Sequence, residues 1–168
     1  TRAISDGTGA NQITFAIFNE DGTEIFTPKT SRTISGNQLL KGVEIKATLV
    51  KGNTYKACFW AQNSNCTAYS ISEDMKVTIN YEGLNNDETR DAFFAYTEPF
   101  TVDVNPRLRV ILKRPFAQIN VGSTKDDIDA ITASGVKVSK SEAIIEDIPS
   151  ELNLFNGNTD KPVNVNYA

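Results

Sequence analysis

Apolar and polar residues alternate along most of the chain, which is the pattern of extended strands that bury one face. The strongest pattern lies in residues 108–122, where Leu108, Val110 and Leu112 share one face of an extended chain. Pro115 cannot donate a backbone hydrogen bond, so it separates this first strand from a second one. We expect these two strands to form the centre of a core sheet.

The same alternation predicts further short strands with turn signals between them. These strands are expected at residues 13–18, 24–26, 43–49, 55–62, 75–81, 93–104, 135–148, 150–155 and 163–167. Residues 43–49 and 55–62 should pair as a hairpin, in which Phe59 and Trp60 point to opposite faces. Residues 27–37 are polar, which predicts a long exposed loop.

The period changes in residues 123–134, where Ile128 and Ile131 lie on one helical face. Ser123 or Thr124 can cap this helix and Gly135 can end it. We expect it to be the only helix. Many short strands and one short helix predict an all-β sandwich, and a length of 168 residues fits a single domain.

Composition narrows the function classes. The apolar content of 39% is enough for a core, and the net charge of −4 argues against nucleic acid or an anionic membrane as the partner. No apolar run approaches the roughly 20 residues that span a bilayer. The polar opening of the chain is not a signal peptide, which we do not take as a sign of the cytoplasm.

Catalytic and metal-binding motifs are missing. The chain has no histidine, so it lacks the commonest general base, and we find no P-loop, dinucleotide fingerprint or nucleophile elbow. We therefore predict no enzyme, no catalytic residue, no cofactor and no metal. The loop at residues 85–91, which holds three acidic side chains, could form a calcium site, but its spacing matches no calcium loop. We favour a solvated loop in which Arg90 pairs with a carboxylate.

Two residue classes leave alternatives open. Cys58 and Cys66 are either free buried thiols or a disulfide across a hairpin that turns near residues 63–65. Aromatic side chains could stack on sugars, although in a sandwich they more often belong to the core. The candidates are Trp60, Tyr69, Tyr81, Phe94 and Tyr96.

Three stretches together resemble a known family. They are GNTYKACFWAQ at 52–62, NDETRDAFFA at 86–95 and LKRPFAQINVG at 112–122. Their order and spacing are similar to those of the fimbrillin-like proteins of the Bacteroidetes, the subunits and anchors of surface fimbriae. The similarity is strongest to the N-terminal domain of the minor, anchor-type members.

This resemblance implies a transthyretin-like Greek-key β-sandwich with the short helix in a crossover, usually followed by a second sandwich. It implies export to the cell surface and outer membrane, held there only by an N-terminal lipid whose cysteine is absent from this sequence. It also implies assembly with other fimbrial subunits by strand addition. Polymerising relatives are trimmed after their first strand by an arginine-specific protease. Arg32, in the predicted loop, is the natural place, and an ordinary surface arginine is the alternative.

The sequence therefore predicts a non-enzymatic structural or adhesion subunit of cell-surface fimbriae, in an anchor, stalk or tip position. The alternative is a binding module of a surface lipoprotein, which takes a glycan or a host protein. A third class, an accessory domain of an enzyme, would need a catalytic domain elsewhere in the protein.

Overall fold

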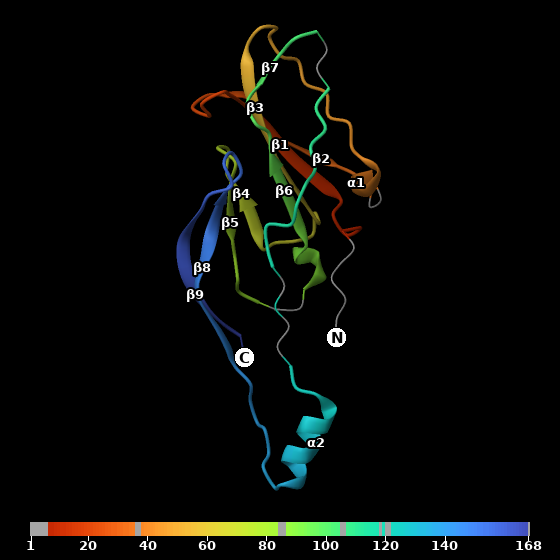
Figure 1. The fold of residues 1–168 in the computed structure, drawn as a ribbon, viewed down its shortest axis with the longest axis vertical. Helices are drawn as coiled ribbons and strands as arrows, with labels where there is room; N and C mark the ends of the chain where they lie inside the picture. Colours follow the sequence, from red (N-terminus) through yellow and green to blue (C-terminus); the bar gives the residue numbers. More distant parts are fainter. Residues whose placement is uncertain are drawn as a thin grey trace.

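The computed structural model describes residues 7–35, 38–83, 87–104, 107–117, 119 and 122–167. Two antiparallel sheets face each other, and a long connection carries a helix to the far end of the molecule (Figure 1). The predicted all-β sandwich with a short helix is confirmed. Within the described residues, no helix is long and apolar enough to cross a membrane.

The first sheet has five strands in the order β2-β1-β3-β6, with β7 pairing β3 beyond the end of β6. Their bounds are β1 Gln12–Asn19, β2 Ile25–Thr33, β3 Thr54–Gln62, β6 Ala92–Tyr96 and β7 Phe100–Thr101. The second sheet has four strands in the order β4-β5-β8-β9. Their bounds are β4 Tyr69–Ile71, β5 Lys76–Ile79, β8 Ala143–Asn153 and β9 Thr159–Tyr167.

The core lies between the two sheets. Trp60 of β3 is fully buried there and packs in one cluster with Val77 of β5 and Leu152 of β8. Phe59 points to the opposite face of β3, as predicted, and packs under the chain that follows β2. Alternation along β1, β3 and β5 therefore decided which side chains enter the core.

The predicted hairpin of residues 43–49 with 55–62 is wrong, because residues 43–49 form no strand. β3 has no free edge for them: β1 pairs with one side of it, and β6 and β7 pair with the other. Val43, Ile45 and Leu49 still point inward and cover the outer face of the first sheet. Alternation thus predicted the buried face at these three positions but not at Ala47, which is exposed, and it did not predict the backbone pairing.

The predicted loop at residues 27–37 is also wrong over most of its length, because β2 runs to Thr33. β2 is an edge strand, so it needs only one paired side and tolerates Pro28. Arg32 lies opposite Ile13 of β1 in this pairing. Polar composition on an edge strand produced the mistaken loop assignment.

The helix is confirmed as α2, Lys125–Ala133, and the Thr124 hydroxyl caps it by accepting from the Asp127 amide at 3.2 Å. It is not the only helix, because one turn, α1 (Gln38–Lys41), and a 3-10 turn, η1 (Glu88–Arg90), are also present. Residues 135–142, predicted as strand, have no regular structure. Strand character begins at Ala143 instead.

The predicted central pair of strands at 108–122 is wrong for the part that the structure describes. Residues 107–112 form no strand, and Leu108 and Ile111 are 52% and 68% exposed. Phe116 packs against the core, whereas Ile119 is 72% exposed. Gln118, Asn120 and Val121 lie outside the described residues. The stretch with the strongest strand pattern is thus left beside the sheet rather than inside it.

Candidate protein-interaction groove

A groove of about 400 Å³ separates the edge of the first sheet from the chain that follows β7. Residues 96–100 line one side of it and residues 108–111 line the other. The groove lies where the expected central strand fails to pair.

One side of the groove is shaped by the break between β6 and β7. Tyr96 pairs with β3 opposite Cys58, and Phe100 resumes the pairing opposite Tyr55. Pro99 lies between them and has no amide hydrogen to continue the ladder. Thr97, within this break, is held against β3, because its amide donates to the Ala57 carbonyl at 2.8 Å. The edge of the sheet is therefore interrupted between β6 and β7, and the interruption has a defined position.

The other side of the groove is an extended segment that lacks a sheet partner. Among the residues with described structure, 107–112 make no strand pairing, although Val110 and Ile111 are β-branched residues that favour strands. The segment meets the sheet at Lys113, which exchanges two backbone hydrogen bonds with Phe94 of β6. A strand-prone chain is thus held beside a sheet edge with an open groove between them.

Exposed apolar side chains continue along the whole connection from β7 to β8. More than half of the large hydrophobic side chains that are exposed in the described residues lie there. They are Val104, Leu108, Ile111, Ile119, Ile128, Ile131, Val136 and Val138. Burying one such side chain is worth about 1.5–3 kcal/mol, so this concentration of them makes the connection a candidate contact surface for another protein.

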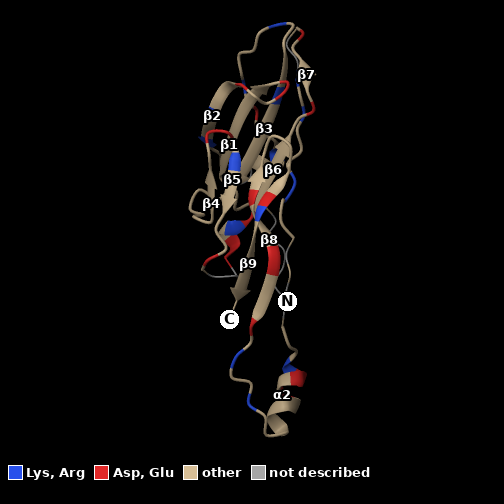
Figure 2. Ribbon diagram, turned by 90° about the vertical axis from the view of Figure 1, so that its left-hand side faces the viewer, with Lys and Arg blue, Asp and Glu red and all other residues tan. Residues whose placement is uncertain are grey.

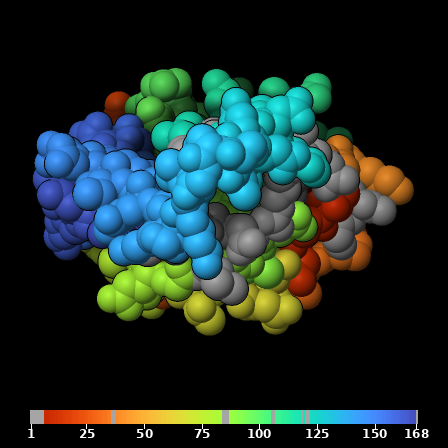
Figure 3. Space-filling view, turned by 90° about the horizontal axis from the view of Figure 1, so that it is seen from below, coloured from red at the N-terminus to blue at the C-terminus, as the bar shows by residue number. Residues whose placement is uncertain are grey.

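The helix α2 lies beyond the ends of the strands in both side views (Figure 1 and Figure 2). Seen from below, the residues around it lie across this end of the molecule, next to β8 (Figure 3). No residue of α2 is buried. The connection therefore offers apolar side chains at two places, at the groove and at α2.

The groove segment is basic. Arg107, Arg109 and Lys113 have no ion-pair partner in the described part of the chain, and Arg109 lines the groove. The neighbouring Arg114 is held by Asp91, through contacts of 2.7 and 2.9 Å to its two carboxylate oxygens. An acidic partner segment would therefore be favoured over a basic one.

The two cysteines are free thiols, and both are buried. Cys58 lies in the core between the sheets, where burial raises the pKa of its thiol to about 12. A thiol with so high a pKa carries almost no thiolate at neutral pH, so Cys58 is chemically inert in the folded protein.

Arg32 lies on β2 and not in a loop, which corrects the predicted position of a processing site. Its guanidinium donates to the Glu44 carbonyl at 3.3 Å. A protease would have to pull β2 away from β1 before this bond could enter an active site. Cleavage at Arg32 stays a prediction, and it would require β2 to separate from β1 first.

The acidic loop is built from local hydrogen bonds over its described residues; Asn85 and Asn86 lie outside them. Asp87 caps η1 by accepting from the Thr89 amide at 2.9 Å. Arg90 donates to the Glu82 carbonyl, so a backbone oxygen takes the place of the carboxylate partner that we expected for it. Among the described side chains, no group of three could hold a metal ion.

The aromatic candidates for sugar stacking divide into core and surface residues. Trp60 is fully buried, and Tyr69, Tyr81 and Phe94 pack against its cluster. The Tyr69 hydroxyl donates to the Arg90 carbonyl at 2.6 Å, and burial raises the pKa of this tyrosine. Tyr96 is 37% exposed and lines the groove. Trp60 therefore cannot stack on a ligand.

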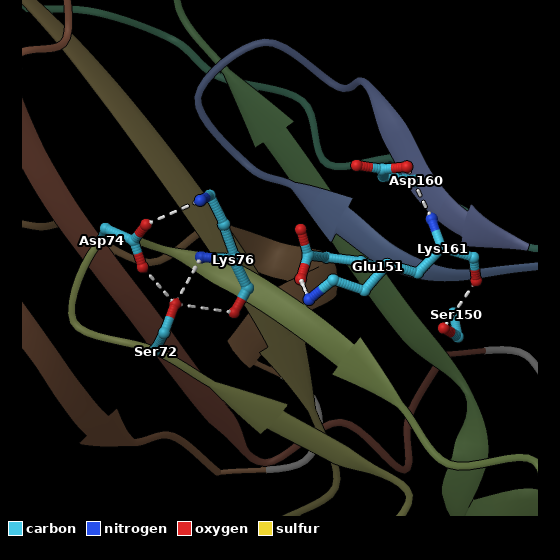
Figure 4. A network of polar contacts seen from close by, with 7 residues as sticks. All are labelled: Ser72, Asp74, Lys76, Ser150, Glu151, Asp160 and Lys161. Carbon is cyan, nitrogen blue, oxygen red and sulfur yellow. Dashed lines mark hydrogen bonds and ion pairs between the residues drawn. The ribbon is translucent and has the colours of Figure 1, made fainter.

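Polar side chains of the second sheet form two groups of contacts, one around Asp74 and one around Lys161 (Figure 4). Lys161 of β9 pairs with Glu151 of β8 at 2.5 Å, and Lys76 of β5 pairs with Asp74 at 3.1 Å. A hydrogen bond from Ser72 and then the Lys76 ammonium hold the pKa of Asp74 below its usual value. The Glu151–Lys161 pair therefore joins β8 to β9, whereas the contacts of Ser72, Asp74 and Lys76 stay within the β4–β5 turn and the start of β5.

Comparison with known proteins identifies a family but not a function. The chain belongs to a family of unknown function (DUF6562), whose model matches residues 1–168. No curated protein and no solved structure matches the chain. The groove and its exposed apolar residues are therefore the main guide to function. Sequence reasoning placed Leu108 and Val110 in the core, and only the missing pairing of their segment shows them to be groove residues.

Proposed function

We propose that this protein is a non-enzymatic structural or adhesion subunit of cell-surface fimbriae, which assembles with other protein subunits by strand addition. The observation that carries the proposal is the groove between residues 96–100 and 108–111. It lies between a sheet edge and a strand-prone segment without a strand partner. The resemblance of three sequence stretches to the fimbrillin-like proteins supports the same reading.

Strand addition suits this groove physically. An extended segment from another subunit would find residues 107–112 without strand pairing in the described structure, and apolar side chains such as Leu108 and Phe100. In such complexes the main-chain hydrogen bonds supply affinity, and the side-chain pockets supply specificity. The partner segment would thus pair with residues 108–112 and turn them into the sheet strand that their sequence pattern predicts.

The proposal includes the place of action. The protein is exported and held at the outer membrane by an N-terminal lipid, as an anchor, stalk or tip component. No cofactor and no nucleic acid take part. A ligand-binding module of a surface lipoprotein is the second candidate function, and it is favoured by a small hollow lined by polar side chains such as Thr14 and Gln62.

Photo-crosslinking in the native cell tests the proposal. A benzophenone amino acid replaces Leu108 at the groove and, as a matched control, Thr78 on the exposed face of β5. Illumination should give a ladder of covalent adducts with other surface subunits from position 108 and none from position 78. Adducts of equal yield at both positions, or none at either, would overturn the proposal.

The mass and termini of the protein extracted from native membranes complete this test. A lipidated N-terminus that precedes β1 indicates an anchored subunit, whereas a chain that starts after Arg32 indicates a processed subunit that polymerises. A lipidated protein that continues into a catalytic domain would contradict a fimbrial role.

A further inference from the structure

A second hollow lies at the opposite margin of the first sheet, between β1 and β2 on one side and β4 on the other. Its volume is about 190 Å³. Thr14 and Gln62 line it, and they are the two buried polar side chains among the described residues, at 2% and 7% exposure. Both buried polar side chains of the described residues thus line the same pocket.

Buried polar side chains are costly unless they are hydrogen-bonded, so their hydrogen bonds show what is left for a ligand. The Gln62 side-chain carbonyl accepts from the Trp60 indole at 2.7 Å, which fixes the orientation of the amide. The Gln62 amide nitrogen has only long contacts, of 3.4 Å to the Asn63 carbonyl and 3.5 Å to the Cys66 carbonyl. Since good bonds of this kind are near 2.9 Å, this nitrogen keeps donor capacity.

Two hydroxyl groups lie together in the same pocket. The oxygens of Thr14 and Ser31 are 2.8 Å apart, so one donates to the other. Each hydroxyl has one donor and two acceptor positions, and the pair uses one donor and one acceptor. The pair therefore retains both donating and accepting capacity toward a third polar group.

The charge of the pocket is neutralised within the protein. The Lys29 ammonium reaches across from β2 to the Ile71 carbonyl at 2.9 Å and to the Glu73 carboxylate at 2.8 Å. A lysine already paired with a carboxylate gives little advantage to an anionic ligand. The remaining wall is supplied by Tyr69 and Ile71, which are partly buried and apolar over most of their surface.

We propose that this pocket binds a neutral, hydroxyl-rich ligand, of the size of one sugar ring. Hydroxyls of the ligand would exchange hydrogen bonds with Gln62, Thr14 and Ser31, and its carbon face would lie on the apolar wall. A volume of about 190 Å³ holds roughly six water molecules, which such hydroxyls can replace one for one. The pocket is too small for the drug-sized ligands that occupy cavities above about 300 Å³.

This inference does not rest on the fimbrial proposal. The pocket is formed by β1, β2, β3 and β4, and it shares no lining residue with the groove. A protein that fails to polymerise could still bind the ligand, and a fimbrial subunit could lack it. The two proposals are therefore tested separately.

The test is a titration of the ¹⁵N-labelled full chain followed by amide chemical shifts. The probes are glucose, galactose and N-acetylglucosamine, each as the free sugar and as its methyl glycoside. Concentrations up to about 50 mM detect dissociation constants in the millimolar range. At least one probe should give saturable shifts centred on the amides of Thr14, Ser31 and Gln62. Equal binding of the methyl glycoside indicates the end of a glycan, and its loss indicates a free sugar.

Variants locate the binding. Ser31→Ala removes an exposed hydroxyl of the pocket with little risk to folding, and Thr14→Val removes its buried partner. Each should weaken binding about 2- to 10-fold, which is the loss expected for one neutral hydrogen bond. Ser70→Ala, on the exposed face of β4 and outside the pocket, is the matched control and should bind as the wild type does.

Three results would overturn the inference. One is that no probe gives saturable shifts at the pocket amides of the folded wild-type chain. Another is that sodium acetate gives the same shifts and displaces the sugar, because that would show an anion site on Lys29. Equal affinity of Ser31→Ala, Thr14→Val and wild type would likewise place the binding elsewhere.

Discussion

Phe94 and Lys113 exchange two backbone hydrogen bonds, of 2.8 and 2.9 Å, across the edge of the first sheet. In the described residues, this bridge is where the connection from β7 to β8 joins that edge. It also closes one end of the segment that lines the groove. The position of the groove wall therefore depends on the amide and the carbonyl of Lys113.

Replacing Lys113 by proline should release this wall. Proline removes the amide that donates to the Phe94 carbonyl and restricts the residue before it, so we expect a loss of about 1–3 kcal/mol in the free energy of unfolding. Urea denaturation measures the loss, and hydrogen exchange at the Phe94 amide should become faster. Lys113→Ala keeps both hydrogen bonds and should change stability by less than about 0.5 kcal/mol. Slow exchange at Phe94 in the proline variant would show that the protection of this amide does not depend on the amide of Lys113.

The Asp21-Gly22 turn between β1 and β2 should not tolerate a side chain. Gly22 has a φ of +74°, and a Cβ atom there would lie 2.3 Å from the Phe155 ring. Gly22→Ala combines about 1–2 kcal/mol for the left-handed backbone with about 1–3 kcal/mol for displacing the ring. Gly52→Ala is the matched control, since its φ is +86° and no atom lies within 4 Å of its Cβ position. Thermal unfolding of the two variants should therefore differ, and equal losses would rule out the contact with Phe155.

The sequence predicted the fold better than the site because the two depend on different information. Alternation along residues 55–62 and 75–81 reports which side chains are buried, and Trp60, Met75 and Val77 of these two stretches lie in the core. Pairing depends on which strand edges are free, and that is a property of the whole sheet. Residues 43–49 alternate equally well but meet a β3 whose two edges are already occupied.

The same distinction explains the groove. Val110 and Ile111 have the β-branched side chains that favour strands. In the described structure, however, the backbone pairing with the sheet occurs at Lys113, just after their segment. A local pattern cannot show whether its partner lies in the same chain or in another one. The polar pocket was missed for a related reason: Thr14 and Gln62 sit within apolar strands, and only the packing of the two sheets brings them together.

Both cysteines should be protected from thiol reagents in the folded protein. Cys58 is fully buried with its pKa raised to about 12, and Cys66 is 6% exposed. A disulfide-exchange reagent at pH 8 should therefore react slowly with native protein and quickly with both thiols after unfolding without reductant. Ser64→Cys, an exposed position two residues from Cys66, should react at once and serves as the positive control. Absence of titratable thiols in the unfolded protein would instead reveal a disulfide.

The ion pair of Asp74 with Lys76 should give a small pH-dependent stabilisation. The pKa of Asp74 is lowered from 3.8 by the Ser72 hydrogen bond and then by Lys76, so its contribution is present above the unfolded value. It is lost as the pH falls through the lower pKa of the folded state. Because the side chain is largely exposed, Asp74→Asn should cost less than about 1 kcal/mol at pH 7.

Urea denaturation of Asp74→Asn, Lys76→Met and the double variant checks this sign. The coupling between the two positions should be measurable at pH 7 and should shrink as the pH falls through the lowered pKa of Asp74, where the carboxyl group takes up its proton. A coupling that is equally large at low pH would mean that the two side chains interact through packing rather than charge.

Substitutions at Leu108 and Ile111 distinguish a role of these side chains in folding from a role in binding a partner. In a core strand, replacing a leucine or isoleucine by a small residue costs about 2–5 kcal/mol. These side chains are 52% and 68% exposed beside the groove, so Leu108→Ser and Ile111→Ser should change the free energy of unfolding by less than about 0.5 kcal/mol each. Val77→Ser, at a fully buried position of β5, is the control for a core strand and should be severely destabilised.

The same two groove variants should lose their adducts with other subunits when the photo-crosslinker is placed at Val110, which lines the groove between them. A partner segment that buries both side chains would lose most of its apolar contact, while the folded subunit would be unchanged. If the variants unfold as easily as Val77→Ser, residues 108–112 belong to the core of the isolated protein. If they remain stable and the adducts persist, the partner does not occupy the groove.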